Sequence, residues 1–228
     1  MLSFKKLFNE RQNDVDKSEQ AESAWADILE QIKQNSGILE PTVFDDGINA
    51  YTFSLSYIND EYEGVVYFMF DPMSEHMGYY DDTNNAIYIN ADEDAYDKYM
   101  KYFEFGTEEF DETAEKFFTK LFDENIFIHE FIHYLDHNNY QVFDKTTYSD
   151  HDHEDPTAYF NNQSEINARF LETLAKYKYK IDNFDRFPQY LNAFFTEWND
   201  VHGDYKHITK ENRKRIAKRL HDYWDQNK

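Results

Sequence analysis

The spacing of apolar residues changes along the chain and predicts two kinds of structure in succession. Apolar residues recur at helical spacing over residues 25–32, and Gly37 with Pro41 ends that helix. Residues 9–23 before it are polar and charged, which predicts a loose lead-in or a frayed helix start. Between residues 43 and 90 the pattern becomes that of strands.

Three strands are predicted in this second stretch. Residues 51–57 alternate aromatic or apolar side chains with smaller or polar ones, as a half-buried strand does. Residues 65–70 form a continuous β-prone run, Pro72 and Gly78 bracket a loop, and residues 86–90 form a short third strand. Together these segments predict a small, mostly antiparallel sheet.

The pattern becomes helical again after about residue 93. Residues 117–135 carry apolar side chains on much of the helix circumference, which indicates a helix buried in the centre of a domain. Residues 139–163 are rich in Asp, His, Thr and Asn and are expected to be a loop. Further helices are expected over residues 166–177, 187–201 and 207–225.

These elements predict an α+β fold with a central buried helix and a helical C-terminal half. A chain of 228 residues is long enough to bury a substantial core. We expect residues 1–22 to be a loosely ordered lead-in and residues 23–228 to form a single domain. Aromatic residues make up 19% of the chain, so this core should be rich in Phe and Tyr.

The charge of the chain restricts its partners. Asp and Glu number 46 against 23 Lys and Arg, which gives a formal net charge of -23. Such a surface repels phosphate backbones, so we expect no nucleic-acid binding. A soluble acidic surface is the ordinary interpretation, and mimicry of DNA or a preference for basic substrates is the alternative. Residues 206–219 hold seven basic side chains, expected on a solvated helix face or, alternatively, on a docking surface for an acidic partner.

Other features bear on the location of the protein. The chain has no cysteine, which excludes disulfides and Cys-ligated metal sites. Its N-terminus has two lysines but becomes polar at Asn9, before the apolar segment of a signal peptide can form. No apolar run approaches the length of a membrane span. We therefore expect no membrane contact and a cytoplasmic location in the producing or host cell.

The sequence His129-Glu130-Phe131-Ile132-His133 carries the clearest chemical signal. Histidines four residues apart lie one turn apart on the same face of a helix, so both imidazoles can bind one ion. Glu130 projects beside such an ion and can accept a proton from metal-bound water. This spacing predicts a zinc site on the buried helix.

A catalytic zinc site usually has a third protein ligand, and Glu165 is the best candidate. It lies 32 residues after His133, near the start of the next predicted helix, and Ala168 one turn later would allow close packing. The ordinary alternative is an acid in the first turn of a helix, favoured by the helix dipole, with Ser164 as the N-cap.

The motif and the later Glu resemble the gluzincin branch of the zinc metallopeptidases. His137 and the Glu165-x-x-Ala168 box are similar in particular to small metallopeptidases that cleave phage repressors and to related phage-encoded zincins. Residues 86–90, before the motif, resemble the zincin edge strand that pairs with an extended substrate. The resemblance covers about residues 85–175, and it implies a zincin-like domain that holds Zn²⁺ through His129, His133 and Glu165.

The sequence departs from the gluzincin pattern around the third ligand. Ser164 precedes Glu165 where the family has Asn, and no carboxylate follows until Glu172. The acid that orients a ligand imidazole therefore has no counterpart by position, and Asp136 and Asp200 are both candidates.

His137 either donates a hydrogen bond to a metal ligand or is an alternative ligand itself. Eight residues after His129 it has turned about 80° round a helix, which favours the outer role.

The family mechanism assigns roles to further residues. Glu130 would be the general base, and a Tyr or His would stabilise the oxyanion. Tyr159, six residues before Glu165, is our candidate for that second catalytic role, and the other candidates are His151, His153, His202 and His207. The segment His151-Asp152-His153-Glu154-Asp155 is expected to be an exposed polar loop, with a second metal site as the alternative.

The resemblance implies a zinc-dependent peptidase acting on a protein or peptide, for which a basic host protein is one candidate. Two alternatives do not require catalysis. One is an acidic phage-encoded antagonist of a host DNA-binding protein, and the other is a virion-associated structural protein with a metal-stapled core.

Overall fold

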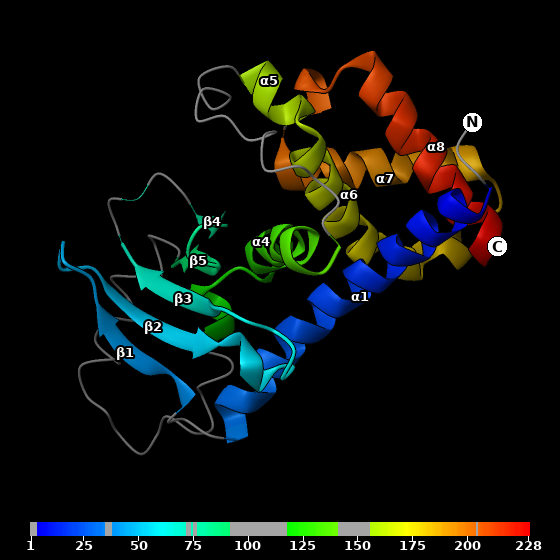
Figure 1. Ribbon diagram of the computed structural model, residues 1–228. Coiled ribbons are helices and arrows are strands. Elements are labelled where there is room, and N and C mark those ends of the chain that lie inside the picture. The colour runs from blue at the N-terminus through cyan, green and yellow to red at the C-terminus, as the bar shows by residue number, and fades with distance from the viewer. Residues whose placement is uncertain are drawn as a thin grey trace. The chain divides into compact units, whose positions relative to one another are not determined.

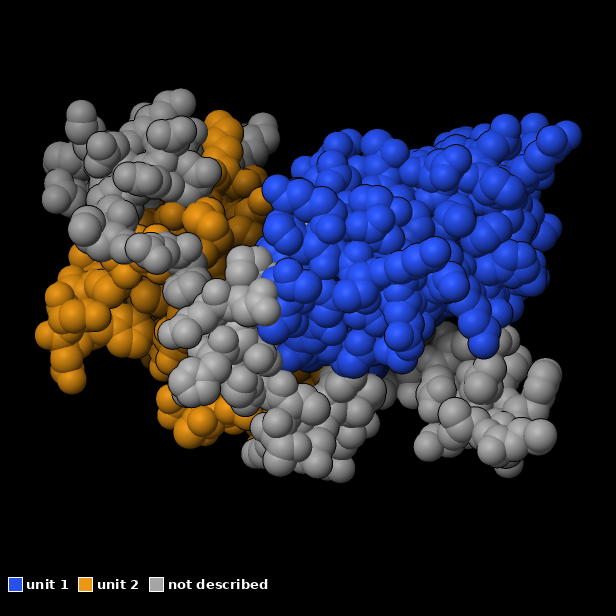
Figure 2. Space-filling model, turned by 90° about the horizontal axis from the view of Figure 1, so that it is seen from above, with its two compact units in different colours: residues 1–20, 139–228 blue, residues 21–138 orange. Residues whose placement is uncertain are grey.

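The computed structural model is an α+β fold with a small mixed sheet and a mostly helical remainder (Figure 1). It describes residues 4–34, 38–71, 74, 77–91, 118–140, 156–203 and 205–228. The chain divides into two compact units, which Figure 2 distinguishes by colour. Unit 1 consists of residues 1–20 and 139–228, and unit 2 consists of residues 21–138. The single domain over residues 23–228 that the sequence led us to expect stays a prediction.

The N-terminal helix begins earlier than its apolar pattern. Helix α1 (Phe4–Gln34) is 31 residues long, so residues 4–22 are helical where we predicted a loose lead-in or a frayed start. That stretch contains three Lys, three Glu and two Gln, which favour helix even without an apolar stripe. Its first part belongs to unit 1 and its remainder to unit 2.

The sheet of unit 2 has five strands in the order β1-β2-β3-β5-β4. The parallel pair is β3 with β5, and the other three pairings are antiparallel. The strands are β1 (Glu40–Val43), β2 (Asn49–Ser54), β3 (Val65–Phe70), β4 (Gly78–Asp81) and β5 (Ala86–Asn90).

Three of the five strands were predicted and two were not. The predicted segments 51–57, 65–70 and 86–90 correspond to β2, β3 and β5. The end of the first segment forms instead a 3-10 turn, η2 (Leu55–Tyr57). Strands β1 and β4 have four residues each, too few to show a period of two, and Gly78 opens β4 where we predicted a loop.

The position of the edge strand also differs from the expectation. We predicted that residues 86–90 form the edge strand, but β5 lies between β3 and β4. Among the described strands, β4 therefore lies at the end of the sheet beside β5. The distinction matters because only an edge strand offers unpaired backbone groups to a partner.

Helix α4 (Glu124–Leu135) packs against β4 and β5 (Figure 1). The predicted helix over residues 117–135 is interrupted before Asp123, whose carboxylate accepts a hydrogen bond from the Asn125 amide at 2.8 Å as an N-cap. A π-helical turn, η3 (Asp136–Tyr140), follows α4. Phe68, Phe118 and Phe122 form an aromatic cluster in this core, with ring centroids 4.5 to 5.0 Å apart.

Unit 1 is helical over residues 156–227 almost without interruption. Its elements are α5 (Pro156–Asn161), α6 (Gln163–Tyr177), η6 (Lys178–Asn183), α7 (Phe187–His202), η7 (Tyr205–His207) and α8 (Lys210–Asn227). The three predicted helices are confirmed as α6, α7 and α8. Helix α5 lies in the stretch that we expected to be a loop.

The basic side chains of α8 are divided between the interior of unit 1 and solvent. Arg219 donates to the Asn167 amide oxygen at 2.7 Å, and its guanidinium lies 4.1 Å from the centre of the Phe170 ring. Arg215 remains exposed and pairs with Glu211 at 2.8 Å. Part of the predicted solvated face thus ties α8 to α6.

A helix that spans a membrane needs about 20 predominantly apolar residues. Within the described parts of the chain, none combines the length and the apolar character that crossing a bilayer demands.

Candidate metal centre

The imidazoles of His129 and His133 converge, as the four-residue spacing predicts. Both project from α4, with their Nε2 atoms 3.2 Å apart and their rings inclined at 74°. Two nitrogens bound tetrahedrally to one zinc at about 2.0–2.1 Å are separated by roughly 3.3 Å. The pair therefore fits a shared ion. A hydrogen bond between the two rings gives a similar distance, so the 3.2 Å separation fits both a shared metal ion and a pair of hydrogen-bonded rings.

Glu130 lies on the part of α4 that faces β4. It is 8% exposed, and its Cγ lies 3.3 Å from the position that a Cβ on Gly78 would occupy. The same added atom would overlap Ile126 Cγ2. A glycine at residue 78 thus allows the edge strand to approach the helix that carries the predicted general base.

We expect Gly78→Ala to destabilise the protein by about 1–3 kcal/mol, because the new methyl group overpacks the contact between β4 and α4. The free energy of unfolding from a urea titration measures this effect. Ile126→Ala removes the overlapping Cγ2, so the double variant should lose less than the sum of the two single losses. Strictly additive losses would contradict this account of Gly78.

Glu165 is buried in unit 1, with only 1% of its surface exposed. It lies in the first turn of α6, whose N-cap is Asn162 rather than Ser164, since the Asn162 side chain accepts from the Ser164 amide at 2.8 Å. Arg169, one turn later, places Nε 3.6 Å from Glu165 Oε2. Glu165 is therefore not the solvent-exposed first-turn acid of the ordinary alternative. Burying a carboxylate is costly unless a nearby cation compensates its charge, and Arg169 is such a cation.

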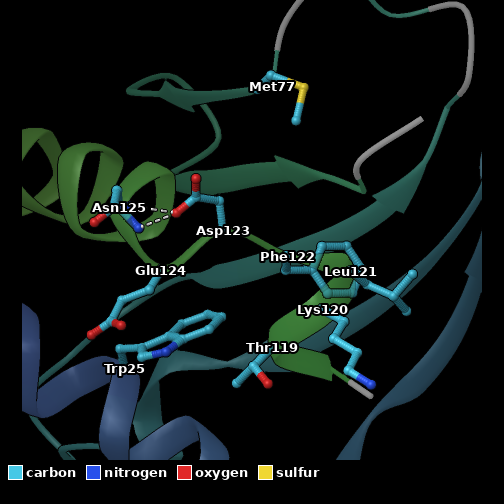
Figure 3. A pocket seen from close by; sticks show the side chains of 9 residues that line it. All are labelled: Trp25, Met77, Thr119, Lys120, Leu121, Phe122, Asp123, Glu124 and Asn125. Carbon is cyan, nitrogen blue, oxygen red and sulfur yellow. Dashed lines mark hydrogen bonds between the residues drawn. The ribbon is translucent and has the colours of Figure 1, made fainter. Parts of the chain in front are cut away.

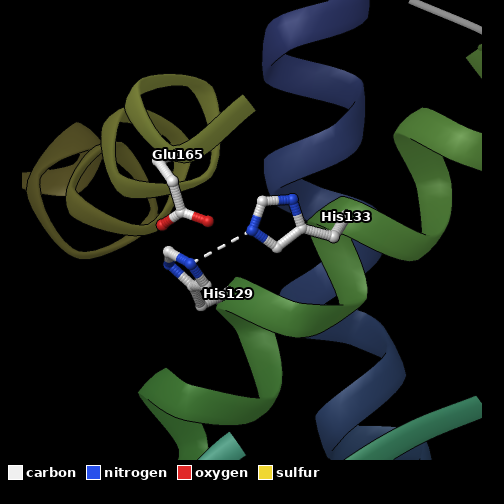
Figure 4. A group of neighbouring side chains, drawn as sticks. All are labelled: His129, His133 and Glu165. Carbon is white, nitrogen blue, oxygen red and sulfur yellow. Dashed lines mark hydrogen bonds between the residues drawn. The ribbon is translucent and has the colours of Figure 1, made fainter. Parts of the chain in front are cut away.

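His129, His133 and Glu165 form a group that could hold a metal ion (Figure 4). Each offers one ligand atom, the two histidines from unit 2 and Glu165 from unit 1. They are the three residues that the sequence suggested as ligands. The donor set of two imidazoles and one carboxylate is typical of catalytic zinc. That these residues bind zinc remains a prediction.

The residues that could support a ligand imidazole from outside the metal site have different environments. Asp136, 3% exposed, follows His133 by three residues, whereas Asp200 is exposed on α7. The ring of His137 packs against Tyr80, with centroids 5.9 Å apart. These environments favour Asp136 over Asp200 as the residue that orients an imidazole.

The candidates for oxyanion stabilisation lie mostly in unit 1. Tyr159 is half-buried on α5, and its ring centre lies 5.5 Å from the Arg169 guanidinium. His202 Nε2 lies 3.6 Å from Glu172 Oε2, and His207 stacks on the ring of Phe160. His151, His153 and the segment 151–155 lie outside the described residues. The role of Tyr159 stays a prediction.

A pocket of about 380 Å³ opens in unit 2 beside the N-terminus of α4 (Figure 3). Trp25, Met77 and residues 119–125 line it. Met77 directly precedes β4, and Asn125 is one helical turn before His129 on the same helix. The pocket therefore adjoins both the edge strand and the helix that bears the motif. No pattern in the sequence indicates this pocket, because its walls come from three separate segments.

In comparisons with known proteins, no family model, no curated protein and no solved structure matches the chain.

Proposed function

We propose that this protein is a zinc-dependent peptidase. The observation that carries the proposal is the convergence of the His129 and His133 Nε2 atoms, 3.2 Å apart on one buried helix, with Glu130 between them in sequence. Helix geometry accounts for the convergence of the imidazoles. It does not explain why an acid with 8% exposure lies between them, whereas a hydrolytic site requires one there.

His129, His133 and Glu165 would hold the metal. Their donors suit Zn²⁺, which prefers nitrogen and carboxylate ligands in an approximately tetrahedral arrangement. A bound zinc supplies a Lewis acid, which lowers the pKa of water and polarises the carbonyl of the bond to be cleaved. The chain has no cysteine, so it must build any zinc site from these residue types.

Glu130 would move the proton. Its carboxylate would accept a proton from the attacking water and then donate it to the amine that leaves when the peptide bond breaks. Burial of Glu130 excludes bulk water from this exchange. The Tyr159 hydroxyl is our candidate donor to the developing oxyanion.

Strand β4 would bind the substrate backbone. It lies at the end of the described sheet, and Gly78 at its start faces Glu130. A peptide that pairs with β4 would lie about 4.8 Å from that strand, which is the spacing of neighbouring strands in a sheet. It would therefore pass beside the proposed general base, Glu130. The pocket beside Met77 could receive one of its side chains.

The proposal is tested on protein purified without added zinc. We expect metal analysis by mass spectrometry to find close to one zinc per chain, and we expect the protein to cleave fluorescently labelled casein. The chelator 1,10-phenanthroline should stop the cleavage, and added ZnCl₂ should restore it. A chain that cannot be loaded with zinc would refute the metal site. Stoichiometric zinc without cleavage would favour the metal-stapled structural protein instead.

A further inference from the structure

Three tyrosines form a stacked ladder across the end of the sheet. Tyr67 of β3 pairs in register with Tyr88 of β5, and Tyr88 pairs in register with Tyr79 of β4. The rings of Tyr67 and Tyr88 are stacked with centroids 5.0 Å apart, and those of Tyr88 and Tyr79 with centroids 4.4 Å apart. Each strand thus adds one ring to the same row.

The ladder ends at Tyr79, on the edge strand. Successive side chains of a strand alternate between the faces of the sheet. Gly78 and Tyr80 face α4, since Gly78 approaches Glu130 and the Tyr80 ring lies 6.0 Å from that of Tyr134. Tyr79 therefore belongs to the opposite face. It is 44% exposed, and among the described residues only Tyr88 stacks on its ring.

The next position in this row would be filled by a residue of any strand that pairs with β4. Cross-strand neighbours in register have Cβ atoms about 5 Å apart, so the side chain opposite Tyr79 would lie against the outer face of its ring. A flat group stacks best there. This geometry restricts one substrate position without involving the metal.

The charge around Tyr79 restricts that position further. Asp81 lies two residues along β4 and therefore on the same face. Burial, and then the Asp81 charge, raises the pKa of Tyr79, which keeps the phenol neutral. The whole chain carries a charge of -23. A planar cation suits these surroundings, and the guanidinium of arginine is the planar side-chain group that stays positively charged at neutral pH.

We infer that Tyr79 selects peptides that carry an arginine at the position paired with it. The inference rests on the proposed function only for its statement that the peptide extends β4. Because Gly78, the neighbouring residue, faces Glu130, the selected arginine would lie within two residues or so of the bond that is cleaved. The substrate class is therefore an extended, arginine-containing segment of a protein.

Binding of two matched peptides tests the inference. Both are fluorescein-labelled pentapeptides of the sequence Thr-Val-X-Val-Thr, where X is arginine in one and citrulline, its uncharged analogue of the same shape, in the other. Fluorescence anisotropy with the full-length Glu130→Gln variant, chosen to prevent cleavage, gives the two dissociation constants. We expect the arginine peptide to bind more tightly, and Tyr79→Ala to lower that preference by about two- to fivefold.

Control variants separate the ring from general charge attraction. Tyr79→Phe keeps the ring and should keep the preference, and so should Tyr57→Ala, which removes a tyrosine that is 52% exposed outside the ladder. Attraction by the net charge survives in every variant, so only the part that Tyr79→Ala removes belongs to the ladder.

Three results would overturn the inference: no binding of either peptide, no preference for arginine, or an equal preference in Tyr79→Ala. The proposed peptidase function is refuted separately if the wild-type chain binds no zinc and cleaves no casein while the preference for arginine over citrulline still depends on Tyr79.

Discussion

Replacing Glu130 with Gln is expected to lower kcat for peptide hydrolysis by a factor of about 10²–10⁴, the range that general acid–base catalysis contributes. The zinc content should stay the same, because the amide keeps the shape of the side chain and Glu130 is not among the proposed ligands. The loss arises because an amide cannot accept the proton of the attacking water. Initial rates on labelled casein, together with metal analysis of the same samples, measure both quantities.

Glu61→Gln is the matched control for this substitution. Glu61 is exposed in the turn before β3 and lies outside both the pocket and the proposed ligands, so the same chemical change should leave both rate and zinc content unaltered. Cleavage by Glu130→Gln at the wild-type rate would remove Glu130 from the mechanism. Loss of zinc in that variant would show instead that its carboxylate contributes to metal binding.

The parts of the fold that the sequence predicted correctly are those that depend on local periodicity. Helix α6 and strands β3 and β5 show their apolar pattern within a single segment, and the geometry of one helix brings His129 and His133 together. The aromatic-rich core follows from composition, as the contacts among Phe68, Phe118 and Phe122 illustrate.

The features that were missed depend on relations between segments. The sequence of β5 does not reveal which strands pair with it, so its interior place in the sheet could not be predicted. From the sequence alone, Gly78 resembles a loop residue. Only the packing of α4 shows why a glycine is needed there, because Ile126 occupies the space that a Cβ would fill. The ladder of Tyr67, Tyr88 and Tyr79 likewise requires the register of three strands.

The candidate third ligand illustrates both situations. The position of Glu165 near the start of a helix was predictable, but its burial and its proximity to Arg169 were not. The gluzincin pattern has an acid one turn after this glutamate, and this chain has Arg169 there. A cation at that position offsets the cost of burying the Glu165 carboxylate.

His133→Ala is expected to reduce the zinc content of the purified chain from close to one ion to a small fraction of one. Loss of residues that merely support a ligand weakens metal binding by about 10–100-fold, and loss of a ligand should weaken it more. Peptide cleavage should disappear with the metal. Mass-spectrometric metal analysis after dialysis against metal-free buffer measures the first effect, and casein hydrolysis measures the second.

His221→Ala is the control for nonspecific histidine effects. His221 lies on α8, its side chain is 49% exposed, and its Nδ1 pairs with Asp225 at 3.1 Å, so its removal should leave zinc and cleavage unchanged. Thermal unfolding separates loss of metal from loss of fold. A chelator should lower the Tm of the wild type and of His221→Ala but not that of His133→Ala, because a bound ion stabilises only a chain that retains its site. Equal zinc in all three proteins would exclude His133 as a ligand and, with it, the metal centre on α4.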